Sequence, residues 1–178
     1  MGCSFCASGL CGLKRNLTAS EMLSQIMMAA KDNNIRVSNV VMMGMGEPLD
    51  NYDNTVRFLN LVSDELGLNI GLRHISVSTS GVVPKIYSLM ETGMPITLSI
   101  SLHAPTNEIR DKIMKVNHAY PIEMLLKACK EYTEKTGRRI SFEYALISGI
   151  NDTDECAGIL AKKLRGMFAF IVWDKEKN

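Results

Sequence analysis

Short apolar runs alternate with longer segments of helical periodicity along most of this chain. The apolar runs, which predict strands, cover residues 37–43, 75–80, 96–103 and 140–147. Helical periodicity predicts helices over residues 54–66, 84–91, 107–114, 122–136 and 154–164. Because consecutive parallel strands need a connection about as long as a helix, the alternation predicts an α/β fold. Its parallel sheet is either closed as a barrel or open and doubly wound, with right-handed crossovers.

One more helix is predicted ahead of the first strand. Thr18, Ser20 and Glu21 are typical of a helix start. Apolar residues follow at helical spacing, and the helix is expected to end near residues 33–34.

Small polar side chains occupy every second position of two predicted strands. The first strand carries Ser76, Ser78 and Ser80, and the next carries Thr97, Ser99, Ser101 and His103. Buried parallel strands usually consist of continuous apolar runs, so two hydroxyl-lined faces predict a wet lumen that holds a ligand. The alternative is a strand face turned to solvent. On the following strand, Glu143 is expected to point a carboxylate into the same cavity.

Three motifs fall at predicted strand ends, where βα folds place their ligands. They cover residues 44–48 (Gly-Met-Gly-Glu-Pro), 78–81 (Ser-Thr-Ser-Gly) and 101–105 (Ser-Leu-His-Ala-Pro). Glycines allow close backbone approach, and the Glu47 carboxylate can accept hydrogen bonds from an ammonium group. A plain turn is the alternative for the first motif, and a core histidine is the alternative for His103. Because all three motifs share one edge of the sheet, we expect a ligand to lie across it.

The chain contains five cysteines, and two of them are close together near its start. The spacing of Cys3 and Cys6 lets both thiolates reach one metal ion or cluster. A zinc site would need further ligands, and a thioredoxin-like pair would sit at a helix N-terminus after a strand. A small zinc-binding or thiol-redox module is nevertheless an alternative function. Cys11 extends the series, whereas Cys129 and Cys156 are predicted to be buried in helices.

Composition and charge narrow the class of protein. A length of 178 residues fits one domain. The net charge of +1 is much smaller than the strongly positive charge expected of a stand-alone nucleic-acid-binding protein. Any contact with RNA must therefore come from local patches or from absent segments. The chain has no signal peptide and no apolar run long enough to span a membrane. We expect a soluble, cytoplasmic protein with reduced thiols and no membrane partner.

Together, the motifs resemble the RlmN-type radical S-adenosylmethionine (SAM) methyltransferases of the RlmN/Cfr family. The resemblance rests on residues 1–8, 12–17, 40–48, 78–84, 101–105 and 107–111. It implies a partial (β/α)6 radical SAM (TIM-like) barrel whose first strand is missing. It also implies methylation of carbon-2 of an adenine in 23S ribosomal RNA. Some members also act on transfer RNA, and the Cfr enzymes methylate a different carbon of the rRNA adenine.

The same resemblance implies two cofactors and several site residues. Family members bind a [4Fe-4S] cluster through a C-x3-C-x2-C loop, and one iron binds S-adenosyl-L-methionine, which is cleaved to a radical on reduction. An electron donor and RNA are therefore the implied partners, and we expect a monomer. Cys3 and Cys6 match the second and third cluster ligands, and the cofactor-binding positions are Gly46, Glu47, Ser78, Ser101, Leu102 and His103.

Departures from the family pattern lie near both ends. The first cluster ligand would precede Met1, Cys11 lies on the wrong side of the pair to replace it, and the family's catalytic cysteines match no residue of this chain. We therefore expect an incomplete radical SAM domain over residues 1–166 and a divergent tail over 167–178. An incomplete fragment of the enzyme and a catalytically inactive remnant are both consistent with this pattern.

Overall fold

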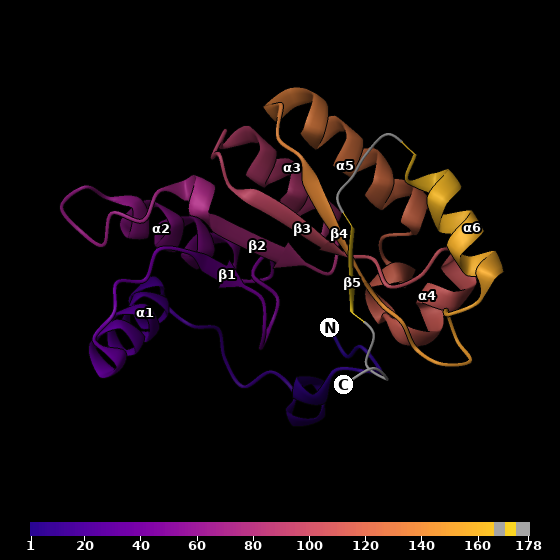
Figure 1. Cartoon of the computed structure of the whole chain (residues 1–178), viewed down its shortest axis with the longest axis horizontal. Coiled ribbons are helices and arrows are strands. Elements are labelled where there is room, and N and C mark those ends of the chain that lie inside the picture. The colour runs from indigo at the N-terminus through magenta and orange to yellow at the C-terminus, as the bar shows by residue number, and fades with distance from the viewer. Residues whose placement is uncertain (166–169, 174–178) are drawn as a thin grey trace.

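The structure is a computed structural model that describes residues 1–165 and 170–173, without the side chains of residues 10, 11 and 170–173. Its centre is one parallel sheet whose strands follow each other in chain order (Figure 1). A doubly wound sheet would reverse its strand order, so the sequential order selects the barrel-type alternative. The strands are β1 (Val40–Met42), β2 (Ile75–Thr79), β3 (Thr97–Ser101), β4 (Ile140–Ala145) and β5 (Phe170–Trp173).

Helices connect the successive strands. In Figure 1, α3, α5 and α6 lie along one side of the sheet, and the N-terminal segment with the short turn η1 lies on the other side. Helix α1 lies against α2, and α3 lies against α5. The helices are α1 (Ala19–Asn33), α2 (Tyr52–Ser63), α3 (Val83–Glu91), α4 (Asn107–Ile113), α5 (Ile122–Thr136) and α6 (Asp154–Lys163), with 3-10 turns η1 (Ala7–Cys11), η2 (Leu72–His74) and η3 (Lys115–His118).

The core lies between the sheet and these helices. Val77, Leu98, Ile100 and Phe142 are almost fully buried on the strands, and apolar residues of α2, α3 and α5 complete the same cluster. Burying one such side chain stabilises a fold by about 1.5–3 kcal/mol. This packing confirms the predicted α/β fold class.

The predicted elements agree closely with the structure, although several ends differ by two or three residues, as at α2, which spans Tyr52–Ser63 where 54–66 was predicted. The first strand is shorter than predicted, and β5 was not predicted because the segment after residue 166 was treated as a divergent tail. Residues 166–169 and 174–178 of that tail lie outside the described residues. Cys129 and Cys156 are buried, as predicted. No helix in the described part of the chain is both long and apolar enough to cross a membrane.

Candidate functional site

Glu47 connects the loops that follow β1 and β2. Its Oε2 accepts hydrogen bonds from the Ser80 N–H at 2.7 Å and the Ser80 hydroxyl at 2.8 Å, and its Oε1 accepts one from the Leu49 N–H at 3.0 Å. Gly46 has a φ of +99°, a conformation that favours glycine, so the loop can turn directly before Glu47. The carboxylate is thus held at the carboxyl edge of the sheet, where the sequence predicted a ligand.

A second carboxylate, Glu143, lies on the hydroxyl-lined face. Parallel register places Ser101 opposite Glu143, and Ser78 lies on the adjacent strand β2. The Ser78 hydroxyl donates to both Glu143 oxygens at 3.1 and 3.2 Å, and the Ser101 hydroxyl donates at 3.0 Å. One layer below, the Ser76 and Ser99 hydroxyls are 3.2 Å apart.

The hydroxyl-lined strands lie inside the sheet. Strands β2 and β3 are each paired on both sides, so the alternative of an edge strand turned to solvent does not apply to them. The ligand-holding lumen itself stays a prediction.

His103 follows β3 and is held in an unusual conformation. Its φ of +55° lies in the left-handed region, which is rare for residues other than glycine. The ring Nδ1 accepts a hydrogen bond from the Ala145 N–H at 3.0 Å, so the neutral ring carries its proton on Nε2. Burial, helped by the nearby charge of Arg110, lowers the pKa of His103 to about 4. The Phe5 ring meets the imidazole edge-on, with centroids 5.0 Å apart.

Cys3 and Cys6 belong to one tight turn beside α4. The Cys6 N–H donates to the Cys3 carbonyl at 3.2 Å, and the Ser4 N–H donates to the Ile113 carbonyl at 2.9 Å. Burial, together with the neighbouring Cys6, raises the pKa of the half-buried Cys3 thiol. Redox-active cysteines have a lowered pKa, so this environment does not favour a thioredoxin-like pair. The 3-10 turn η1 follows Cys6 directly.

These two cysteines do not form a complete metal site by themselves. Within the described residues, no group of three or more His, Cys, Asp or Glu side chains is placed to hold a metal ion. The donor set therefore fits part of a cluster site and does not fit a closed zinc site. The side chain of Cys11 lies outside the described residues.

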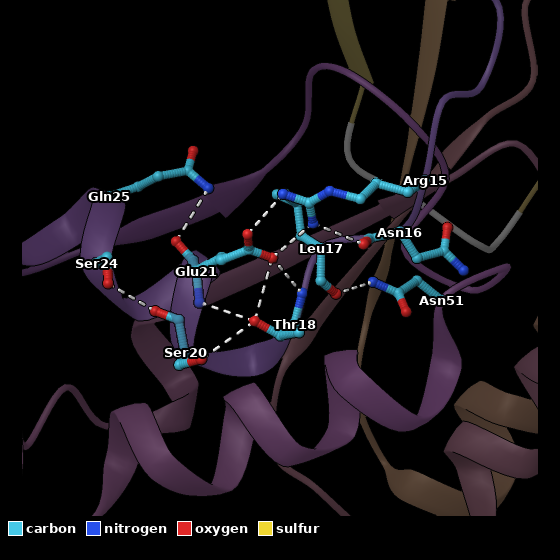
Figure 2. A network of polar contacts seen from close by, with 9 residues as sticks. All are labelled: Arg15, Asn16, Leu17, Thr18, Ser20, Glu21, Ser24, Gln25 and Asn51. Carbon is cyan, nitrogen blue, oxygen red and sulfur yellow. Dashed lines mark hydrogen bonds and ion pairs between the residues drawn. The ribbon is translucent and has the colours of Figure 1, made fainter.

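A polar network holds the segment between the cysteines and α1. Figure 2 shows the Arg15 guanidinium bound by both oxygens of Glu21, at 2.7 and 2.8 Å. Glu21 also accepts from the Thr18 N–H and completes a capping box at the start of α1. The Asn51 side chain, at the start of α2, donates to the Leu17 carbonyl at 2.7 Å. The network therefore ties the segment after the cysteines to the loop that follows Glu47.

Sequence reasoning missed two buried residues that support the strand ends. Arg110 was noted only as part of a motif, and Asn151 was not singled out. The Asn151 amide donates to the carbonyls of His103 at 2.7 Å and Ala145 at 2.8 Å. Helical spacing could have identified Arg110, because it lies three residues before the buried Ile113 and so on the same face of α4.

The arrangement defines a barrel-type α/β protein with a candidate site at the carboxyl edge of its sheet. Residues 1–157 match the family model of the radical SAM superfamily, and the chain belongs to that superfamily. It is similar to a solved structure, the crystal structure of a radical SAM methyltransferase from Sphaerobacter thermophilus. The TM-score is 0.92 at 46% identity, over 96% of this chain and 51% of that one.

Curated relatives confirm the resemblance to the RlmN type. The chain is 54% identical over 171 residues to the "probable dual-specificity RNA methyltransferase RlmN" of Alkaliphilus oremlandii, covering 96% of this chain and 50% of that protein. It is 54% identical over 170 residues to the protein of the same name from Geobacillus kaustophilus, covering 94% of this chain and 47% of that protein. The chain thus spans about half the length of the curated relatives it matches.

Proposed function

We propose that this chain is the cofactor-binding core of an RlmN-type RNA methyltransferase that modifies carbon-2 of an adenine in 23S ribosomal RNA, and transfer RNA as well. The names of the relatives, dual-specificity RNA methyltransferases, support the reaction class. One observation carries the proposal: Glu47, Ser78, Ser101 and His103 all lie at one edge of the sheet, and each is held there by a hydrogen bond to a neighbouring loop or strand. We propose a cytoplasmic monomer that needs an electron donor.

Each site residue has a proposed role at that edge. Glu47 accepts from the ammonium group at the methionine end of S-adenosyl-L-methionine, and Gly46 lets the backbone approach it. Ser78 and residues 101–103 contact the rest of the cofactor. The Ser80 bonds to Glu47 fix the orientation of its carboxylate before any ligand arrives. Cys3 and Cys6 would contribute two thiolates to a [4Fe-4S] cluster, and the bound cofactors would supply the methyl group and the radical.

Binding of the cofactor tests the proposed site. We expect Glu47→Gln to weaken binding of S-adenosyl-L-methionine, measured by isothermal titration calorimetry, by about tenfold or more, because a charge-assisted hydrogen bond is lost. Glu65→Gln is the matched control, since Glu65 is exposed. Equal affinity in both variants would contradict the assignment of Glu47.

The RNA substrate needs a separate experiment. In a chimera, this chain would replace the matching half of one of the 54% identical relatives, which supplies the remaining segments. We expect carbon-2 methyladenosine in 23S ribosomal RNA by mass spectrometry, and none when the chimera carries Glu47→Gln. A methyl group at another carbon, or no product from a chimera that binds S-adenosyl-L-methionine, would refute the proposed specificity.

A further inference from the structure

The guanidinium of Arg110 is fully buried, and its hydrogen bonds to the described residues all go to neutral groups. Its Nε donates to the Leu102 carbonyl at 3.0 Å, and its Nη1 donates to the Asn117 side chain at 3.2 Å. Its Nη2 donates to the carbonyls of Ser80 at 2.7 Å and Ser101 at 3.2 Å. Within the described part of the chain, no carboxylate lies at ion-pair distance from it. Buried charges are normally paired because desolvation is costly, so this one calls for a functional explanation.

Three of its acceptors belong to strand ends of the candidate site. Ser80 follows β2 and donates to Glu47, whereas Ser101 ends β3 and donates to Glu143. One side chain from α4 therefore joins the carboxyl ends of two neighbouring strands. The planar guanidinium suits this task, because its donors form a rigid fork.

Arg110 also supports the turn at His103. A non-glycine residue with a φ of +55° is strained and persists only where its surroundings fix it. Arg110 holds the carbonyl just before His103, and Asn151 holds the carbonyl of His103 itself. Loss of the guanidinium would leave buried carbonyls without a donor, which favours relaxation of the turn.

The charge of Arg110 reaches the same region. Burial lowers its pKa to about 10, so the guanidinium stays protonated at neutral pH. Burial is the main cause of the low pKa of His103, and the charge of Arg110 lowers it further. The cation therefore lies within electrostatic range of the strand edge.

We propose that Arg110 is a positioning residue of the cofactor site: it clamps the ends of β2 and β3, holds the turn at His103, and provides a positive charge that favours the carboxylate of the ligand. The inference rests on the proposed function, since the ligand is the amino-acid end of S-adenosyl-L-methionine. Arg110 acts by positioning the residues of the site and does not itself contact the reacting atoms.

Three variants test this role. Arg110→Met removes both the charge and the planar set of guanidinium donors, and Arg110→Lys keeps the charge but not those donors. Arg138→Met is the control. Arg138 bonds to the Ile96 carbonyl, at the opposite end of β3. Circular dichroism verifies folding, NMR titration follows the His103 ring, and calorimetry measures the affinity for S-adenosyl-L-methionine and for methylthioadenosine, which lacks the amino-acid end.

Arg110→Met is expected to raise the pKa of His103, with about a tenfold fall in its acid dissociation constant, because a nearby cation is lost. It is also expected to weaken the binding of S-adenosyl-L-methionine about tenfold. The binding of methylthioadenosine should weaken less, because that ligand lacks the amino-acid end. Arg110→Lys should keep the low pKa of His103, because the positive charge is retained. It should still weaken binding of the cofactor several-fold, because one ammonium group cannot contact three carbonyls. Arg138→Met should change neither.

The proposal is overturned if folded Arg110→Met shows the His103 titration and cofactor affinity of the unaltered chain. If Arg110→Met does not fold, unchanged cofactor affinity in Arg110→Lys overturns it instead. An unaltered chain that binds no S-adenosyl-L-methionine contradicts the proposed function. The His103 titration, with hydrogen exchange at the Ala145 amide, then decides whether Arg110 holds the turn.

Discussion

At the scale of single residues, the two carboxylates of the candidate site already accept hydrogen bonds from neighbouring serines. Glu47 is bound by Ser80, and Glu143 is bound by Ser78 and Ser101. Each carboxylate is therefore oriented by the protein and needs no rearrangement to meet a ligand. Such preorganisation lowers the cost of binding.

The coupling between Ser101 and Glu143 is the first prediction. Ser101→Ala and Glu143→Gln should each destabilise the fold, and the double variant should cost less than their sum. A coupling free energy of about 1.5–3 kcal/mol is expected for one hydrogen bond to a carboxylate. Urea unfolding of the four proteins measures it. Strict additivity would mean that the 3.0 Å contact does not contribute in solution.

The second prediction concerns pH and His103. Its pKa is about 4 when folded, whereas an unfolded histidine titrates near 6.5, so the unfolded state takes up the proton first as pH falls. Stability should therefore decline as the pH falls from about 6.5 toward 4, by up to about 3 kcal/mol. The pKa values of Glu21 and Glu123 are lowered to about 2, so the stability that these groups contribute is lost only below about pH 5.

Urea unfolding between pH 5.0 and 7.5 measures this dependence. His103→Gln should flatten the profile, whereas the exposed control His74→Gln should leave it unchanged. A profile that keeps its slope in His103→Gln would assign the effect to another group.

Much of the site was predictable at this scale, and its supporting contacts were not. Glu47, Ser78 and His103 were predicted to share one edge because strand ends converge in βα folds, and their contacts with a cofactor stay predictions. Arg110 and Asn151 act through backbone carbonyls of other elements, and such contacts depend on distances that a sequence does not contain. The metal assignments of Cys3 and Cys6 stay predictions.

At the scale of elements, helix boundaries followed the sequence closely because their signals are local. Helix α5 spans Ile122–Thr136, as predicted, and ends at Gly137 in a left-handed conformation. Strand ends were less predictable, because hydrogen bonds to neighbouring strands define them. The predicted strand over 140–147 ends at Ala145, and beyond it the Ile147 N–H bonds to the Asn151 side chain.

The third prediction belongs to α1. Thr18→Ala removes the cap that accepts from the Glu21 N–H, which should destabilise the protein by about 1 kcal/mol. Ser24→Ala is the control, because the Ser24 hydroxyl bonds only to the Ser20 carbonyl within the same helix. Equal stability of the two variants in urea unfolding would show that the network of Figure 2 does not hold the start of α1.

At the scale of the whole molecule, the sequential parallel order brings the functional segments together. Loops after β1, β2 and β3 meet at one edge, and the cysteine turn contacts α4 beside it. The βα pattern predicted this convergence but left barrel and doubly wound sheets open, and only the family resemblance implied a barrel. Strand order separates them, and it is a property of long-range pairing that no local pattern specifies.

The central claim is that this edge binds S-adenosyl-L-methionine, and an NMR titration of the nitrogen-labelled chain tests it most directly. We predict saturable amide shifts concentrated at Glu47, Ser80, residues 101–103 and Ala145, with little change at the opposite end of the strands. Saturable binding with shifts elsewhere in the chain, or no shifts at millimolar cofactor, would contradict the account.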